Sequence, residues 1–237
     1  MAAKQQARVR RARGSISAEQ VLKGAFEVCA EGSVDRLTMP RLAEHLGVGV
    51  TSLYWYYKSK DELLDAMSVT AFKAFYERIP RLRDGSWEDI LRDYFTNFRR
   101  ALLADDLLCD LVIIRVHFMG DRSYALSWSR IEEILRSLVD AGFSEEAAIN
   151  MYSALSIYTR GAIFIERSRI AAGMPDGFMT TGHNERPDPV TMPLLSKRYQ
   201  LSTEQTVEAE FTFGLNSLID GFRPLLAHSE PATSCAS

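Results

Sequence analysis

Apolar residues recur every three or four positions along most of this chain, the spacing that one buried face of an α-helix produces. In the first third of the chain, the pattern predicts helices over about residues 17–32, 38–47, 50–57 and 59–75. It continues from Ser86 and through the segments 107–118, 122–141, 145–172 and 202–226. We identify no segment with the apolar–polar alternation of a β-strand, so we expect an all-α fold.

Local signals mark where several of these helices begin and end. Serine-led capping boxes occur in "SAEQ" (17–20), "SKDE" (59–62) and "STEQ" (202–205). Thr38 is expected to cap the second helix, with Pro40 in its first turn, where a missing N–H removes no hydrogen bond. Gly47 is expected to end that helix.

Two loops interrupt the helical pattern. Residues 80–85 form a short loop and a candidate domain boundary. Residues 173–200 contain seven glycines and prolines and are predicted to form a long loop. Loops of that length are usually functional or mobile, so this one is a candidate lid.

The charge of the chain is unevenly distributed. Its 237 residues carry a net charge of −3, with 46% hydrophobic and 25% charged residues, which is ordinary for a globular protein. Residues 1–60 contain ten basic and five acidic side chains, a net charge of +5, whereas the remainder contains 18 basic and 26 acidic ones, a net charge of −8. A basic N-terminal region on an acidic body suggests that only the N-terminal region meets a polyanion.

Several classes of protein are disfavoured by what the sequence contains. The cysteines, Cys29, Cys109 and Cys235, are scattered and show neither a disulfide framework nor zinc-ligand spacing. The apolar runs are too short for a membrane span and the N-terminus has no signal-peptide core, so we expect a cytoplasmic protein. We find no nucleophile, zinc-protease, P-loop or dinucleotide motif, and the four histidines pair with no nucleophile. We therefore expect no enzyme, no cofactor and no metal.

Two short helices joined by a glycine-containing turn are typical of a helix-turn-helix, whose second helix lies in the DNA major groove. Here the second helix contains "VTSLYWYYK" (50–58). Leu53 and Tyr57 are four residues apart and are expected to face inward, with Trp55 packed against the neighbouring helix. The outward residues are then Val50, Thr51, Ser52, Tyr54 and Tyr56, followed by Lys58 and Lys60, which suit phosphates.

The segment "LTMPRLAEHLGVGVTSLYWYYKSKDELLDAM" (37–67) resembles the DNA-binding region of the tetracycline repressor (TetR) family. The resemblance covers about residues 15–67 and includes the first helix. The remainder resembles the family only in its length and helical character. The resemblance implies a three-helix helix-turn-helix domain (15–62) and a larger helical ligand-binding and dimerisation domain (63–226). The polar, basic residues 1–14 are predicted to form a disordered arm, and residues 227–237 are predicted to form a frayed tail.

Carried over by position, the family's DNA contacts fall on residues at the start of the second and fourth helices and along the third. These are Thr38, Met39, Pro40, Arg41, Val50, Thr51, Ser52, Tyr54, Tyr56 and Lys60. Two of them depart from the family. Pro40 stands where some members have a base-reading arginine, and Val50 replaces a polar residue, so the base preference should differ from that of the tetracycline operator.

The resemblance also implies a homodimer that binds a palindromic operator in double-stranded DNA, usually as a repressor, and a small molecule that releases it from the C-terminal domain. Candidate pocket residues are Phe95, Phe98, Ile113, His117, Phe118, Tyr152 and Tyr158. Each of these is more often plain core, and His117 is open to either reading. The alternatives are a helix-turn-helix protein–protein adaptor and a ligand-independent activator.

Dimerisation is expected through the two late helices, over residues 145–172 and 202–226, because both are long and rich in apolar residues. The positions at helical spacing are Ala147, Ala148, Met151, Leu155, Phe211, Leu215 and Leu218.

The basic arm before Gly14 is predicted to add DNA affinity without sequence preference. Its first thirteen residues contain five Lys or Arg and no acid. Each phosphate contact contributes about −0.9 to the log–log salt slope, so two contacts per chain of a dimer contribute about 3 to 4 units. Deleting residues 1–13 should flatten the slope by that amount, on specific and unrelated DNA alike.

This prediction is checked by measuring the DNA affinity of the full-length protein and of the protein without residues 1–13 at several salt concentrations. Identical slopes would show that the arm is only a tail, and a loss confined to the specific site would show that it reads bases.

Overall fold

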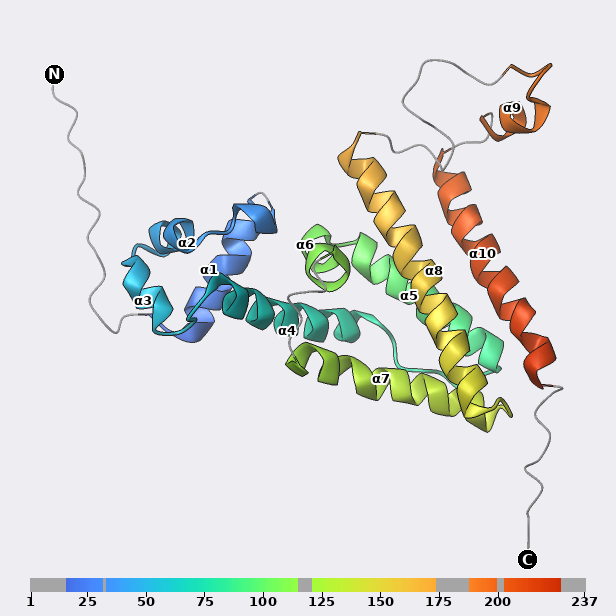
Figure 1. Ribbon diagram of the computed structural model, residues 1–237, viewed down its shortest axis with the longest axis horizontal. Coiled ribbons are helices and arrows are strands. Elements are labelled where there is room, and N and C mark those ends of the chain that lie inside the picture. Colours follow the sequence, from blue (N-terminus) through green and yellow to red (C-terminus); the bar gives the residue numbers. More distant parts are fainter. Residues whose placement is uncertain (1–15, 32, 115–120, 174–187, 200–202, 227–237) are drawn as a thin grey trace, which may run out of the picture. The chain divides into compact units, whose positions relative to one another are not determined.

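The fold was analysed in a computed structural model, which describes residues 16–31, 33–114, 121–173, 188–199 and 203–226. The described elements are helical, as the spacing of apolar residues predicted (Figure 1). They are α1 (Ala18–Ala30), η1 (Val34–Arg36), α2 (Met39–Leu46), α3 (Val50–Tyr54), α4 (Lys60–Arg78), α5 (Trp87–Leu103), α6 (Asp106–Cys109), η2 (Asp110–Ile114), α7 (Asp121–Asp140), α8 (Glu145–Ala171), α9 (Pro193–Tyr199) and α10 (Thr203–Leu226).

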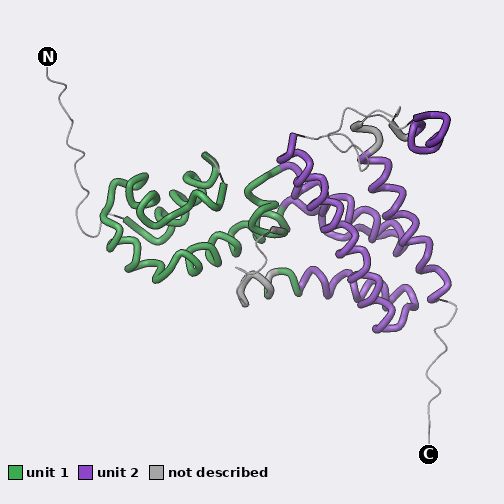
Figure 2. The backbone as a smooth tube through the Cα atoms, turned by 45° about the horizontal axis from the view of Figure 1, so that its top comes forward, with its two compact units in different colours: residues 1–77, 105–128 green, residues 78–104, 129–237 purple. Residues whose placement is uncertain are grey.

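The chain divides into two compact units (Figure 2). The first comprises residues 1–77 and 105–128, and the second comprises residues 78–104 and 129–237. The domain boundary expected after residue 62 therefore falls inside α4, most of which belongs to the first unit.

The first unit is built on α1, which packs against α2, and α2 packs against α3. Its core consists of apolar side chains with almost no exposed surface from successive helices, including Val21, Ala25, Leu42, Leu53 and Leu63. The predicted caps are present at both ends of this group. Ser17 and Gln20 form a complete capping box, and the Ser59 hydroxyl accepts the N–H of Glu62 at 3.1 Å. The Glu62 carboxylate, however, accepts the N–H of Lys58 rather than that of Ser59.

The second unit is a layered helical bundle in which α5 packs against both α8 and α10, and α8 packs against α10. Figure 1 shows α8 and α10 running in opposite directions. On each of these two helices, one or two residues per turn are buried, and they form a stripe along one side. The buried residues include Ala148, Met151 and Leu155 on α8 and Phe211 and Leu215 on α10. These five residues were expected at a subunit interface, but they form the core of the single chain.

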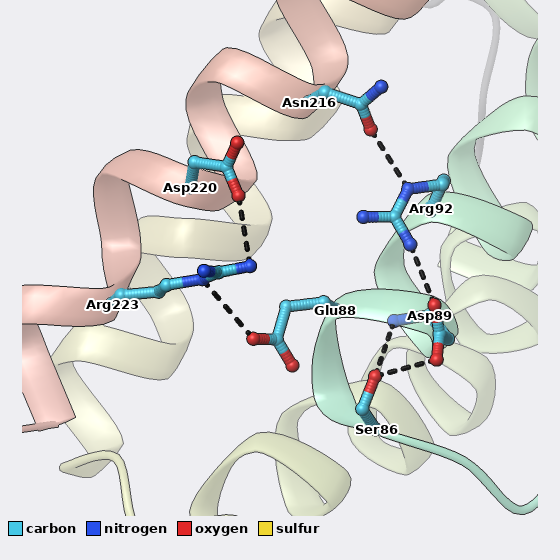
Figure 3. Close-up of polar contacts among 7 residues, drawn as sticks. All are labelled: Ser86, Glu88, Asp89, Arg92, Asn216, Asp220 and Arg223. Carbon is cyan, nitrogen blue, oxygen red and sulfur yellow. Dashed lines mark hydrogen bonds and ion pairs between the residues drawn. The ribbon is translucent and has the colours of Figure 1, made fainter.

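Polar contacts hold α5 to α10 at the edge of this bundle (Figure 3). The Arg92 Nε donates to the Asn216 side-chain oxygen at 2.9 Å, and Arg223 lies 3.4 Å from the Glu88 carboxylate. Ser86 caps α5 by accepting the N–H of Asp89. These contacts fix the register between the start of α5 and the end of α10.

Two helices differ from the sequence prediction, and two predicted helix signals are not tested. Helix α3 ends at Tyr54 rather than near residue 57. Helix α9 lies inside the predicted long loop, and it begins at Pro193, a residue that suits a first helical position. The predicted capping box that begins at Ser202 and the predicted helix stop at Gly32 involve residues outside the described ranges.

Candidate functional site

The turn between α2 and α3 is set by local backbone chemistry. The Thr38 hydroxyl accepts the N–H of Arg41 at 3.2 Å and starts α2, as predicted. Gly47 ends the helix with φ of 67°, a left-handed conformation that favours glycine. The N–H groups of Gly47 and Val48 return to the carbonyls of Glu44 and Ala43, so the chain reverses tightly before α3 begins at Val50.

Helix α3 buries only Leu53 and turns its remaining residues outward or leaves them half-buried. Thr51 is exposed, and Tyr54 is 45% exposed. Val50 and Ser52 are half-buried. The outward surface of α3 therefore carries methyl, hydroxyl and aromatic groups, which are able to contact base edges and phosphates.

Trp55 is 85% exposed, so the expectation that it packs against the neighbouring helix is wrong. Two residues advance a helix by about 200°, and Trp55 follows Leu53 by two residues. Burial of Leu53 therefore turns the indole to the opposite side of α3. This places the largest aromatic ring of the stretch on the same outer surface as Tyr54.

Tyr56 and Tyr57 lie beyond the end of α3 and bind the start of the chain's first helix. The Tyr56 hydroxyl donates to the Ile16 carbonyl, and the Tyr57 hydroxyl donates to the Ala18 carbonyl at 3.4 Å. Partial burial raises the pKa of Tyr57 above its usual value. The Tyr56 hydroxyl, expected to face outward, thus has a partner within the unit.

The start of α2 offers a mixed surface. Thr38 and Pro40 are exposed, but the Met39 side chain is only 5% exposed and packs into the core, so it does not face outward as the family pattern implied. Arg41 is partly exposed, and its guanidinium lies 3.6 Å from the Glu31 carboxylate. Lys60 is half-buried at the start of α4.

A second polar contact joins α1 to α2. The His45 Nε2 lies 2.8 Å from the Glu27 carboxylate, and this hydrogen bond lowers the pKa of Glu27. Lys23 lies 3.8 Å from the same carboxylate. These side chains align the two helices that precede the turn.

The predicted pocket residues are dispersed through the second unit and beyond it. Phe95 and Phe98 are buried, and with Tyr152 they form an aromatic core in which burial raises the pKa of Tyr152. Ile113 is half-buried in the first unit. His117 and Phe118 lie outside the described residues. Tyr158 lines a groove of the second unit.

This groove, of about 500 Å³, lies between α8 and α10, with α5 beneath it. Its lining is mainly apolar with a few charged residues: Arg99, Ile157, Tyr158, Gly161, Ala162, Ile165, Glu166, Arg169, Val207, Glu210 and Phe211. Gly214 allows the Tyr158 ring to lie against α10, since a Cβ on this glycine would stand 2.6 Å from the Tyr158 Cζ. The hydroxyl of Tyr158 donates to the Phe211 carbonyl at 3.0 Å.

Arg99 is the charged residue that the sequence analysis missed. Its side chain is 8% exposed, and it binds Glu166 of α8 at 2.9 Å and Glu208 of α10 at 2.5 Å. Its guanidinium also stands over the Phe211 ring, 4.7 Å from the ring centre. In the sequence, the one sign of this residue's role is that an arginine directly follows Phe98 in an apolar stretch. Its acidic partners are far away in sequence.

The described residues contain no group of three or more potential ligands that could hold a metal ion. Among their helices, none has both the length and the apolar character needed to cross a bilayer.

Two family models match this chain. The model described as bacterial regulatory proteins, tetR family, matches residues 21–67, and the model described as tetracyclin repressor-like, C-terminal domain, matches residues 79–226. Together they span the turn between α2 and α3 and the helical bundle that follows.

Known proteins and solved structures are similar to this chain. An HTH-type transcriptional repressor of Mycobacterium tuberculosis is 36% identical over 95% of this chain and 87% of its own. The class D tetracycline repressor protein of Escherichia coli is 32% identical over 87% of this chain and 89% of its own. Apo ActR of Streptomyces coelicolor, 24% identical, shares the fold with a TM-score of 0.66 over 92% of this chain and 98% of that one.

The burial of Leu53 and the exposure of Trp55 predict a large effect of one substitution on stability and a small effect of the other. Leu53→Ala should lower the free energy of unfolding by about 2–5 kcal/mol, because it empties a filled core position. Trp55→Ala should change it by less than about 0.5 kcal/mol, because the indole is exposed. Denaturant unfolding of the full chain, followed by circular dichroism, measures both. A loss from Trp55→Ala as large as that from Leu53→Ala would place the indole in the core.

Proposed function

This chain belongs to the TetR family of bacterial transcriptional regulators, and we propose that it represses transcription by binding a palindromic operator as a homodimer. In this proposal α3 enters the major groove, and a small molecule held in the C-terminal unit releases the protein. The observation that carries the proposal is the outward surface of α3, where Thr51, Tyr54 and Trp55 stand exposed around a single buried leucine.

The proposed DNA-binding surface has distinct roles for its parts. Thr51, Ser52 and Tyr54 on α3 would read bases, since hydroxyl, methyl and aromatic groups suit the floor of the major groove. Thr38, Pro40 and Arg41 at the start of α2, with Lys60 at the start of α4, would contact phosphates and set the orientation. Trp55 joins this surface as a ring that packs on the sugar–phosphate backbone. Val50 and Tyr56 lie at the edge of this surface. Met39 is buried and has no role in the proposed DNA contact.

A dimer is supported by the outer faces of α8 and α10. Ile157 and Phe164 of α8 and Phe213 of α10 are exposed apolar side chains on the side of each helix that faces away from the core. Gly161 and Gly221 have open space where a Cβ would stand, which leaves room for close approach of another helix. Large exposed apolar residues on two adjacent helices are typical of a subunit interface, and two helices from each chain form a four-helix contact.

The first test concerns DNA. Tyr54→Ala should weaken binding to a duplex selected from random sequence by about 1–3 kcal/mol, the contribution of a good base or aromatic contact. Tyr54→Phe should retain the part of this contribution that comes from stacking. Trp128→Ala is a matched control, because it removes an exposed aromatic ring from another helix and should leave affinity unchanged. Equal affinities of wild type and Tyr54→Ala, measured by fluorescence anisotropy, would remove Tyr54 from the interface.

The second test concerns the dimer. Phe213→Glu should convert a dimer into a monomer in sedimentation at micromolar concentration, because it places a charge in an apolar contact. Thr212→Glu adds the same charge one residue earlier, about 100° around the helix, and should leave the dimer intact. A wild-type protein that sediments as a monomer would contradict the proposed interface, as would a Phe213→Glu variant that stays dimeric.

A further inference from the structure

The outward surface of α3 carries no charged side chain and no side-chain amide. Residues 50–57 have the sequence VTSLYWYY, and the structure describes all of them. Burial of Leu53 leaves Thr51 exposed, while Val50 and Ser52 keep part of their surface in solvent. The chemical groups that the first turn of this helix offers to DNA are therefore methyl groups and hydroxyls.

These groups match one of the four bases better than the others. In the major groove, guanine is usually bound by arginine or lysine, adenine by asparagine or glutamine, and cytosine by a carboxylate. Thymine alone presents a methyl group, which apolar side chains contact. Helix α3 lacks the usual partners of the first three bases, and it has two methyl-bearing side chains, Val50 and Thr51, for the fourth.

We propose that α3 selects its half-site through contacts between thymine methyl groups and the methyl groups of Val50 and Thr51. This inference rests on the proposed function, and it names the base that the recognition helix selects. Both residues lie in the first turn of α3. The N-terminal residues of a recognition helix are the ones that contact base edges.

The hydroxyl groups on this surface do not favour guanine. A hydroxyl both donates and accepts hydrogen bonds, so Thr51, Ser52 and Tyr54 are able to bond to several bases. The N7 atom that a single donor reaches on guanine is present on adenine as well. Discrimination among base pairs therefore depends on the methyl contacts, while the hydroxyls contribute affinity.

The cations of this region lie outside α3. Arg41 belongs to α2, and its guanidinium lies 3.6 Å from the Glu31 carboxylate. Lys58 and Lys60 follow the end of α3, and the backbone N–H of Lys58 donates to the Glu62 carboxylate at 2.6 Å. In a helix-turn-helix, the helix before the recognition helix crosses the DNA backbone, so a cation on α2 meets phosphates. The helix that enters the groove in our proposal has no arginine or lysine to bind guanine.

The test uses the inverted repeat that the full chain enriches from random-sequence duplex DNA. Thymines of this repeat are replaced by deoxyuridine, one position at a time and in both half-sites together. Uracil pairs as thymine does and lacks only the methyl group. One buried methyl group contributes about fourfold in affinity, so replacement at a contacted position in both half-sites should weaken binding about 10- to 20-fold. Fluorescence anisotropy measures these affinities.

Side-chain variants assign the effect to individual methyl groups. Thr51→Ser removes the methyl group and keeps the hydroxyl, whereas Val50→Ala removes two methyl groups. Each variant should reduce the preference for thymine over uracil at one position of the half-site to less than about twofold, as a double-mutant cycle measures it. Thr38→Ser is the matched control, because it removes a methyl group at the start of α2 and keeps the hydroxyl that caps the helix. It should leave every thymine preference as in the wild type.

Methylated cytosine separates the methyl group from the base that carries it. Replacement of a contacted T·A pair by C·G in both half-sites should weaken binding. 5-Methylcytosine at the same position should recover at least about threefold relative to cytosine, because it restores a methyl group at the same place in the major groove.

Three results would overturn the proposal. They are the absence of any thymine whose replacement by uracil weakens binding more than about twofold, thymine preferences that both Thr51→Ser and Val50→Ala leave unchanged, and no recovery with 5-methylcytosine. Failure of the proposed function gives a different result. A chain that binds an inverted repeat equally well with thymine or uracil keeps that function and loses only the methyl contact, whereas a chain that binds no duplex DNA loses both.

Discussion

The orientation of α3 depends on the burial of one side chain, Leu53. It is the buried residue of a helix only five residues long, and full burial of a leucine contributes about 1.5–3 kcal/mol. The N–H groups of Tyr56 and Tyr57 both bond to the Leu53 carbonyl, at 2.9 and 3.0 Å, so the same residue also directs the aromatic stretch as it leaves the helix. The groups that we propose to contact DNA, chiefly Thr51, Tyr54 and Trp55, are those that this burial leaves outside.

The second unit shows the same division between a buried stripe and a remaining face. On α8, Met151 and Leu155 are buried in the core, while Ile157 and Phe164 are exposed. The outer face would cost free energy in water unless another surface covered it, and a second copy of the chain supplies one in our proposal. Arg99 adds a polar link among α5, α8 and α10 at the edge of this core.

Much of the fold was predictable because its signals are local. Caps such as Ser17 and Thr38 act within three residues, and helical spacing is visible within two turns. Side-chain direction was harder to predict, because Trp55 resembles a core residue until the short length of α3 and the burial of Leu53 are known. The pocket was harder still. Arg99 meets its acidic partners across 67 and 109 residues of sequence, and no local pattern indicates which distant acid will reach it. The interface residues expected on α8 and α10 were mostly core for a related reason, since spacing reveals an apolar face but not its partner.

The central claim is that the outward surface of α3 reads DNA from two symmetry-related copies. Selection of the full chain on random-sequence duplex DNA, followed by sequencing of the bound fraction, tests it most directly. A symmetric dimer with one recognition helix per chain predicts an enriched inverted repeat, with two half-sites separated by about one helical turn or a multiple of it. Recovery of no enriched sequence, or of a single asymmetric site, would contradict the account.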